Sequence, residues 1–155
     1  MGVTGPIMGG RRGWPFTAAV FDVGAQGYVE EEFFIDGDAT AYKAAPGTEF
    51  GRDGRWQLQV RETSPFRTRF VVVRPKDGSA FSGNVFLSWA NVSAGFELGG
   101  VSERSLKHGD AHVTMSVQKV GLEGYPGAEA NALRGWDPER YGSLSHPETI
   151  SRTTS

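Results

Sequence analysis

The residues with the clearest chemical potential lie in one short segment, Asn91-Val92-Ser93-Ala94-Gly95. In hydrolases that carry a serine nucleophile on a tight strand-to-helix turn, small residues two positions before and after the serine give the pattern Gly-x-Ser-x-Gly. Gly95 follows Ser93 at the required distance, but asparagine takes the place of the first glycine. A nucleophilic Ser93 would also need a histidine base and a carboxylate to orient it, and the sequence places neither beside it. The chain has three histidines, His108, His112 and His146.

The same loop has a second functional interpretation, which we favour over the nucleophile. In one class of serine hydrolases, a developing oxyanion is stabilised by two backbone N–H groups, one from the residue after the nucleophile and one from the loop that leaves the third strand of the sheet. The candidate residues of such a loop are Val92, Ser93, Ala94 and Gly95. The alternative is an ordinary turn that contains a glycine, in which Asn91 or Ser93 caps the backbone.

The rest of the sequence predicts no metal site and no cofactor. No glycine-rich loop matches the dinucleotide or P-loop fingerprints. His108 and His112 are four residues apart, as two zinc ligands on a helix would be, but a glycine and an aspartate between them argue against a helix. A cluster of acidic residues does not have the spacing of a twelve-residue calcium-binding loop, so we interpret it as a solvated edge of the sheet. The cluster consists of Glu30, Glu31, Glu32, Asp36 and Asp38. One of the three consecutive glutamates must lie near an edge or be paired, because a strand turns successive side chains to opposite faces.

Composition excludes several classes of protein. The chain has 155 residues, the usual size of one domain. It contains 16 basic and 18 acidic residues, a net charge of −2, so we expect neither a nucleic-acid partner nor an anionic membrane. Zero cysteines exclude a disulfide scaffold and a thiol nucleophile. The sequence has no apolar run of about 18 residues and no secretion signal, so a cytoplasmic location is expected.

The segments around the loop predict a βαβ unit that would position it. In Val85–Trp89, every residue except Ser88 is apolar, so apolar side chains would point to both faces of a strand. This pattern is typical of a parallel strand that is covered on both faces. Val101–His108 fits a short helix ended by Gly109, and Ala111–Gln118 fits a second strand. The roughly 20 residues between the strands exceed the dozen or so that a parallel crossover requires.

Upstream, the pattern predicts antiparallel hairpins. Phe16–Val23 and Gly27–Ile35 would form one, followed by a turn at Asp36–Asp38. Two alternating runs within 56–74, joined at Thr63–Pro65, would form another. Its arginines are interpreted as residues of the solvated face rather than as an anion-binding patch; they are Arg61, Arg67, Arg69 and Arg74. From Val120 onward, glycine, proline and polar residues predict a tail that runs over a surface.

Several blocks of the sequence resemble one known family in content and in order. They are Gly27–Phe34, Thr68–Pro75, Phe81–Val85, Trp89–Ser93, Ser116–Gly121 and Trp136–Pro147. The chain is similar over about Gly10 to Pro147 to the N-terminal half of a family of bacterial α/β hydrolase domain proteins, poorly characterised hydrolases of esterase type. The most specific block is Asp137-Pro138-Glu139-Arg140-Tyr141-Gly142. Residues 148–155 diverge from the family.

The resemblance implies an α/β fold class: the N-terminal, strand-rich part of an α/β-hydrolase fold, with antiparallel strands leading into a βαβ unit and an incomplete sheet. It also implies that the serine elbow and the catalytic triad lie beyond residue 155. We therefore expect a single partial domain over 1–155, truncated, inactive alone and with exposed apolar surface. The substrate of full-length relatives would be a small-molecule ester. Three positions depart from the family, Ser88, Ala94 and Glu97, where Glu, Gly and Asp are more frequent.

The alternative from another class is a non-catalytic, β-rich binding module. It would explain the missing triad and would stack a ligand such as a sugar on exposed aromatic rings. Its candidate contacts are Trp14, Trp56, Trp89 and Trp136.

Overall fold

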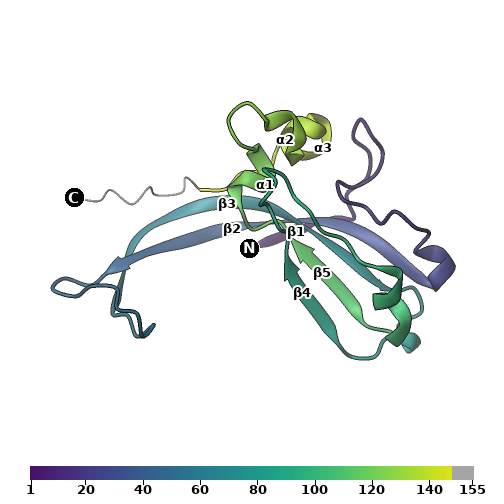
Figure 1. Cartoon of the computed structure of the whole chain (residues 1–155), viewed down its shortest axis with the longest axis horizontal. Coiled ribbons are helices and arrows are strands. Elements are labelled where there is room, and N and C mark those ends of the chain that lie inside the picture. The colour runs from purple at the N-terminus through teal and green to yellow at the C-terminus, as the bar shows by residue number, and fades with distance from the viewer. Residues whose placement is uncertain (148–155) are drawn as a thin grey trace.

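A five-stranded mixed sheet organises the chain in a computed structural model, which describes residues 1–147. The strand order is β1-β2-β3-β5-β4 (Figure 1). All neighbouring strands are antiparallel except β4 and β5, which are parallel. The strands are β1 (Gly2–Thr4), β2 (Tyr28–Ala44), β3 (Leu58–Pro75), β4 (Val85–Trp89) and β5 (Ala111–Met115). The sheet is open, as expected for the α/β fold class with an incomplete sheet.

Strands β2 and β3 form one long ribbon, which corrects the predicted hairpins. Their register runs without interruption from Tyr28↔Pro75 to Ala44↔Leu58, apart from a bulge beside Tyr42. The predicted turn at Asp36–Asp38 and the predicted connection at Thr63–Pro65 therefore lie inside strands, and Phe16–Val23 is not a strand. Proline is tolerated at position 65 because β3 has a strand neighbour on one side only at that point.

The predicted βαβ unit is confirmed. Strand β4 pairs in parallel with β5, with Val85 opposite Ala111, and a 3₁₀ helix at Glu103–His108 lies between them. This helix begins with a capping box of Ser102 and Ser105 and ends at Gly109, whose φ of +75° is left-handed. Strand β5 ends at Met115, three residues earlier than predicted.

Strand β4 is not covered on both faces as the sequence pattern indicated. All five of its residues are exposed, up to 72% for Trp89, and among residues 1–147 it pairs with β5 alone. The predicted exposure of apolar surface is therefore confirmed, and it lies at the parallel edge of the sheet.

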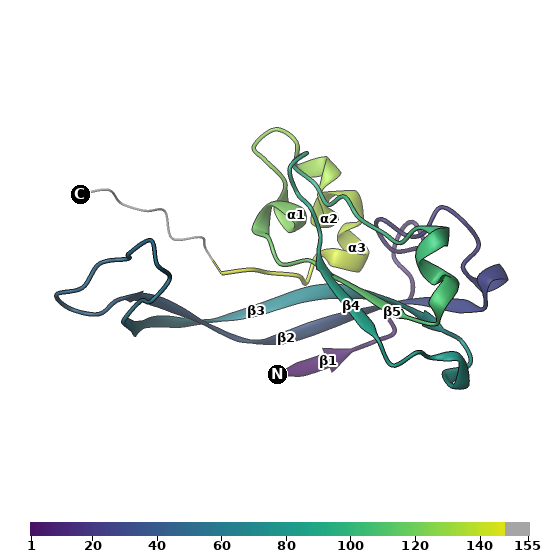
Figure 2. The ribbon, with the colours of Figure 1, turned by 60° about the horizontal axis from the view of Figure 1, so that its bottom comes forward.

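The segment after Val120 forms part of the core rather than a surface tail. Three short helices, α1 (Lys119–Glu123), α2 (Leu133–Trp136) and α3 (Pro138–Tyr141), lie on one face of the sheet (Figure 2). They bury the main hydrophobic cluster, which is composed of Phe16, Phe34, Leu122, Leu133, Tyr141 and Leu144. Helices of four or five residues are too short to show an apolar period, so the pattern could not predict them. In the part of the chain that the structure describes, no helix could span a membrane.

Candidate active-site loop and the ionic cluster behind it

The predicted loop leaves the carboxyl end of β4 and folds back on itself. Asn91 and Leu98 close its base through two backbone hydrogen bonds, Asn91 N to Leu98 O at 3.1 Å and Leu98 N to Asn91 O at 2.7 Å. At its tip the Gly95 N–H donates to the Val92 carbonyl at 2.9 Å. Asn91 Oδ1 accepts the Ser93 N–H at 2.8 Å, so Asn91 caps the turn as the alternative interpretation expected.

These bonds divide the four candidate amides into two pairs. The N–H groups of Ser93 and Gly95 are used inside the loop. The N–H groups of Val92 and Ala94 have no acceptor within residues 1–147. The backbone geometry thus leaves two donors, two residues apart, that could face an anion.

Gly95 fixes the shape of this turn. Its φ is +84°, and a Cβ added there would lie 2.7 Å from Cδ2 of Tyr125. An L-side chain at this position would therefore be strained and would collide with the ring.

A buried ionic cluster anchors the loop to the sheet. Glu97 Oε2 accepts from Nη2 of Arg69 at 2.9 Å, and Nη1 of Arg69 donates to Glu32 Oε1 at 2.7 Å. Nε of Arg140 donates to the other oxygen of Glu32 at 2.6 Å. The four side chains are at most 2% exposed, and two positive charges balance two negative ones. Burial alone would lower the pKa of Arg69, but the carboxylates of Glu97 and Glu32 and the phenol of Tyr141 raise it above its usual value, so the guanidinium keeps its charge.

Residues 137–142, the block most specific to the family that the chain resembles, contact this cluster from the side of α3. The Tyr141 hydroxyl donates to Glu32 Oε1 at 2.9 Å and accepts the Phe16 N–H at 2.8 Å, and burial raises the pKa of its phenol. Asp137 accepts the backbone N–H groups of Arg140 and Arg12 at 3.2 and 3.1 Å. Burial would raise the pKa of Asp137, but these donors hold it below its usual value. The block therefore ties α3 and the N-terminal segment to the sheet.

The comparison with protein families agrees with this architecture. The family model described as "Alpha/beta hydrolase domain" matches residues 3–153 of the chain. The chain belongs to the alpha/beta hydrolase domain family. No curated protein and no solved structure matches it.

The structure of this α/β hydrolase domain corrects two sequence interpretations. Glu32 is not part of a solvated acidic edge, and Arg69 does not lie on a wet face, because each is 1% exposed and paired with the other. Arg74 does lie on a solvated face as predicted, since its ion pair with Glu31 is exposed. The expectation that one of the three consecutive glutamates is paired is confirmed at Glu32. Within residues 1–147, no group of three or more His, Asp or Glu side chains could hold a metal ion.

The histidines do not meet Ser93 in the described residues of the domain. The His112 ring stacks on Phe86 at 5.3 Å and contacts the Ser105 carbonyl at 3.2 Å. His146 lies at a cavity beside the end of β5, against Ser116. The hydrogen bond of Ser93 goes to Asn91 and to no histidine.

The tryptophans of the alternative binding module do not form one aromatic surface. Trp14 and Trp136 line a shared hollow beside the N-terminal segment. Trp89 lies on β4, and Trp56 lies in the β2–β3 connection, where it packs edge-on against Phe50 at 5.3 Å. A single stacked ligand could therefore use Trp14 and Trp136, but not all four rings.

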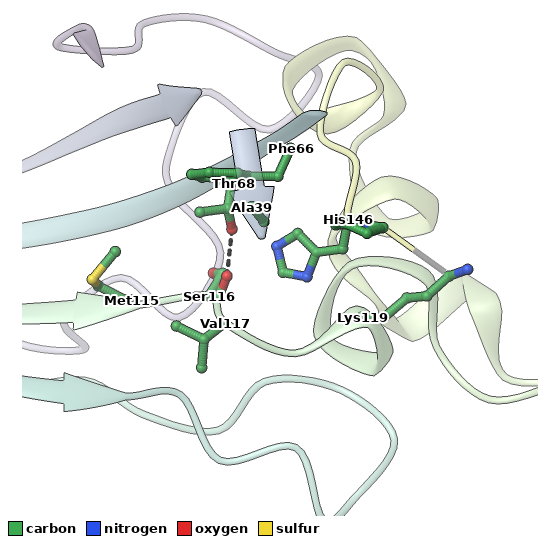
Figure 3. A pocket seen from close by; sticks show the side chains of 9 residues that line it. Ala39, Phe66, Thr68, Met115, Ser116, Val117, Lys119 and His146 are labelled. Atoms are coloured by element: carbon green, nitrogen blue, oxygen red, sulfur yellow. Dashed lines mark hydrogen bonds between the residues drawn. The ribbon is translucent and has the colours of Figure 1, made fainter. Parts of the chain in front are cut away.

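A cavity of about 330 Å³ lies between β3, the end of β5 and the segment that follows α3 (Figure 3). The hydroxyl of Thr68 donates to the Ser116 carbonyl at its wall, and the His146 ring faces the same place. The lining residues are Ala39, Phe66, Thr68, Met115, Ser116, Val117, Lys119, His146 and Pro147. Burial lowers the pKa of His146, although Glu97 and Glu123 oppose the shift, so the folded domain favours the neutral ring.

This shift predicts a pH dependence of stability. The pKa of His146 is lower in the folded domain than in the unfolded chain, so the unfolded chain binds more protons as the pH falls below about 6.5. The stability that the neutral ring contributes is complete above that pH and is lost as the pH falls. The free energy of unfolding of the wild type and of His146→Gln can be measured in urea between pH 5 and 8. The wild type should gain stability relative to the variant as the pH rises. Parallel curves would contradict the prediction.

Proposed function

We propose that this domain supplies the oxyanion-hole loop of a carboxylic-ester hydrolase, whose serine nucleophile lies on a further strand paired with the free edge of β4. The observation that carries the proposal is the loop at the carboxyl end of β4, with the Val92 and Ala94 amides lacking acceptors within 1–147. In open α/β sheets, ligands bind outside the carboxyl ends of the parallel strands. A donor at this place, aimed at the tetrahedral intermediate, would contribute about 3–4 kcal/mol to catalysis.

The edge of the sheet supports the same proposal. Strand β4 exposes Val85, Phe86, Leu87 and Trp89 and has one strand neighbour in the described residues. A next parallel strand, with the helices that cover parallel sheets, would bury these side chains. A nucleophile at the end of that strand would lie next to the 91–98 loop, as the chemistry requires.

The buried ionic cluster gives the loop the rigidity that such a role needs. A preorganised donor costs no reorganisation at the moment of reaction, whereas a misplacement of about 1 Å can cost about 100-fold in rate. Glu97 fixes the loop to Arg69 on β3, so the loop is held by the sheet rather than by its own two backbone bonds alone.

The test is a chimera in which residues 1–147 replace the corresponding part of a longer protein of this fold that hydrolyses activated esters. We expect the chimera to hydrolyse 4-nitrophenyl butyrate and Gly95→Ala to lower kcat about 100-fold, with a smaller effect on KM, because the substitution displaces the turn. Gly54→Ala is the matched control: its φ is +73°, but a Cβ there meets no atom within 4 Å.

The proposal also predicts that the chain alone does not hydrolyse the same ester, and that Ser93→Ala leaves the chimera active. A well-folded but inactive chimera, or equal kcat values for the two glycine variants, would contradict the role of the loop. Turnover by the chain alone that is lost in Ser93→Ala would instead make Ser93 the nucleophile.

A further inference from the structure

The cavity beside His146, here called the His146 cavity, has no role in the function proposed above. It lies where the pairing of β3 with β5 ends at Phe70 and β3 continues to Arg67, which pairs with Ser145 instead. Thr68 lies between these two positions and forms part of the cavity wall (Figure 3). The volume of about 330 Å³ lies at the lower end of the range of small-molecule sites, about 300–1,000 Å³.

Most of the cavity wall is apolar. The apolar residues that line it are Ala39, Phe66, Met115, Val117 and Pro147. An engineered apolar cavity of about 150 Å³ is large enough to bind benzene. The His146 cavity has about twice that volume, so its apolar part fits two fused rings or one ring with a short alkyl chain.

Three polar groups meet at one end of the cavity. The Thr68 hydroxyl donates to the Ser116 carbonyl. A ring nitrogen of His146 faces the same two residues, within hydrogen-bond reach of the Ser116 backbone (Figure 3). Thr68 and Ser116 are 4% and 1% exposed, and within residues 1–147 no N–H or O–H group donates to the Thr68 oxygen. This end of the cavity therefore offers two acceptor oxygens with lone pairs to spare and an imidazole.

The charges around the cavity balance, so an ion is not favoured as its ligand. The Lys119 ammonium at the wall pairs with Glu123 at 3.6 Å, and Glu97 pairs with Arg69 at 2.9 Å. Burial lowers the pKa of His146, so the ring is neutral at pH 7. A hydroxyl group both donates and accepts, so it matches the imidazole and the two oxygens without the cost of burying a charge.

We propose that the His146 cavity binds a small neutral alcohol or phenol, with its hydroxyl beside His146 and Thr68 and its apolar part against Phe66. The hydroxyl pairs with the polar end of the cavity, which the chain itself leaves only partly paired. A ligand with the same apolar part but no O–H leaves that end without a donor and binds more weakly. The proposal concerns the chain alone and does not rest on ester hydrolysis.

2-Naphthol serves as the probe because it has two fused rings and one hydroxyl. The chain has three histidines, so the Cε1–H signal of each ring can be followed by proton NMR, and His146→Phe identifies the signal of His146. At neutral pH, 2-naphthol should shift this signal saturably and leave the signals of His108 and His112 in place. The absence of a saturable shift at His146 would overturn the proposal.

Equilibrium dialysis with 2-methoxynaphthalene tests the role of the hydroxyl. The ether should bind the wild type about tenfold more weakly than 2-naphthol, because its oxygen cannot donate. In His146→Phe, which keeps a ring but has no ring nitrogen, the affinity for 2-naphthol should fall towards that for the ether. The ether should bind this variant about as well as the wild type, which also shows that the variant is folded. Equal affinities of the wild type for the two compounds would contradict the assigned ligand class.

Two alanines of β2 test the location of the site. Ala39→Phe places a ring in the cavity and should abolish saturable binding of 2-naphthol. Ala41→Phe is the matched control, since Ala41 lies two residues further on the same strand and face but is not part of the wall. Unchanged signals of His108 and His112 show that each variant is folded. Binding that survives Ala39→Phe, or that is lost in both variants, would place the probe on another apolar surface and refute the proposal.

Discussion

Replacement of Arg69 with methionine is expected to lower the free energy of unfolding by about 3–5 kcal/mol. The substitution keeps most of the apolar volume but leaves Glu32 and Glu97 buried without the cation between them. Arg140 still contacts Glu32, whereas Glu97 loses its hydrogen-bond donor, and its Oε1 atom already lacks one within residues 1–147. Folded domains of this size are stable by about 5–15 kcal/mol, so the loss is a large share of the total.

Chemical denaturation of the wild type and of two arginine variants measures this effect. Arg74→Met is the control: Arg74 lies on the same strand and pairs with Glu31 at 2.7 Å, but its side chain is 46% exposed. An exposed pair contributes about 0–1 kcal/mol. Similar losses in Arg69→Met and Arg74→Met would show that the buried cluster does not hold the domain together.

The parts of the fold that were predicted correctly depend on local signals. The apolar run Val85–Trp89, the glycine at 109 and the alternation after Ala111 all lie within one short stretch, and together they define the βαβ unit. The long ribbon is not predicted because a turn-like sequence such as Asp36–Asp38 can either form a turn or continue a strand. Pairing with residues about 30 positions away decides between them, and that pairing is not visible in the pattern.

The candidate site, too, can be predicted from the sequence only in part. The loop at Val92–Gly95 could be found from its residue types and its place after a strand, whereas the choice of free amides depends on hydrogen bonds that only the folded backbone shows. The ionic cluster joins residues 28 to 109 positions apart, from Arg69–Glu97 to Glu32–Tyr141. Strand geometry indicated that one of the glutamates at 30–32 had a partner, but it could not identify Arg69 or Arg140.

Gly109→Ala is the second substitution with a large expected effect, because it acts on the connection that sets β4 beside β5. Gly109 has a φ of +75°, which costs an L-residue about 1–2 kcal/mol. A Cβ at this position would also lie 2.2 Å from the Ala80 carbonyl oxygen, in a segment where the Ser82 N–H donates to the Gly109 carbonyl at 2.9 Å. The clash is with backbone, so it cannot be relieved by a side-chain rotation, and overpacking of this kind adds about 1–3 kcal/mol.

The expected loss for Gly109→Ala is therefore about 2–5 kcal/mol in the free energy of unfolding, measured by urea denaturation. Gly54→Ala separates the two causes, since Gly54 has nearly the same φ, +73°, and open space around it. Gly54→Ala should lose only the stability that the left-handed φ costs an L-residue, without the cost of a steric clash. If the two variants lose the same stability, the contact with Ala80 does not constrain the crossover, and the position of β4 must be fixed by its pairing with β5 instead.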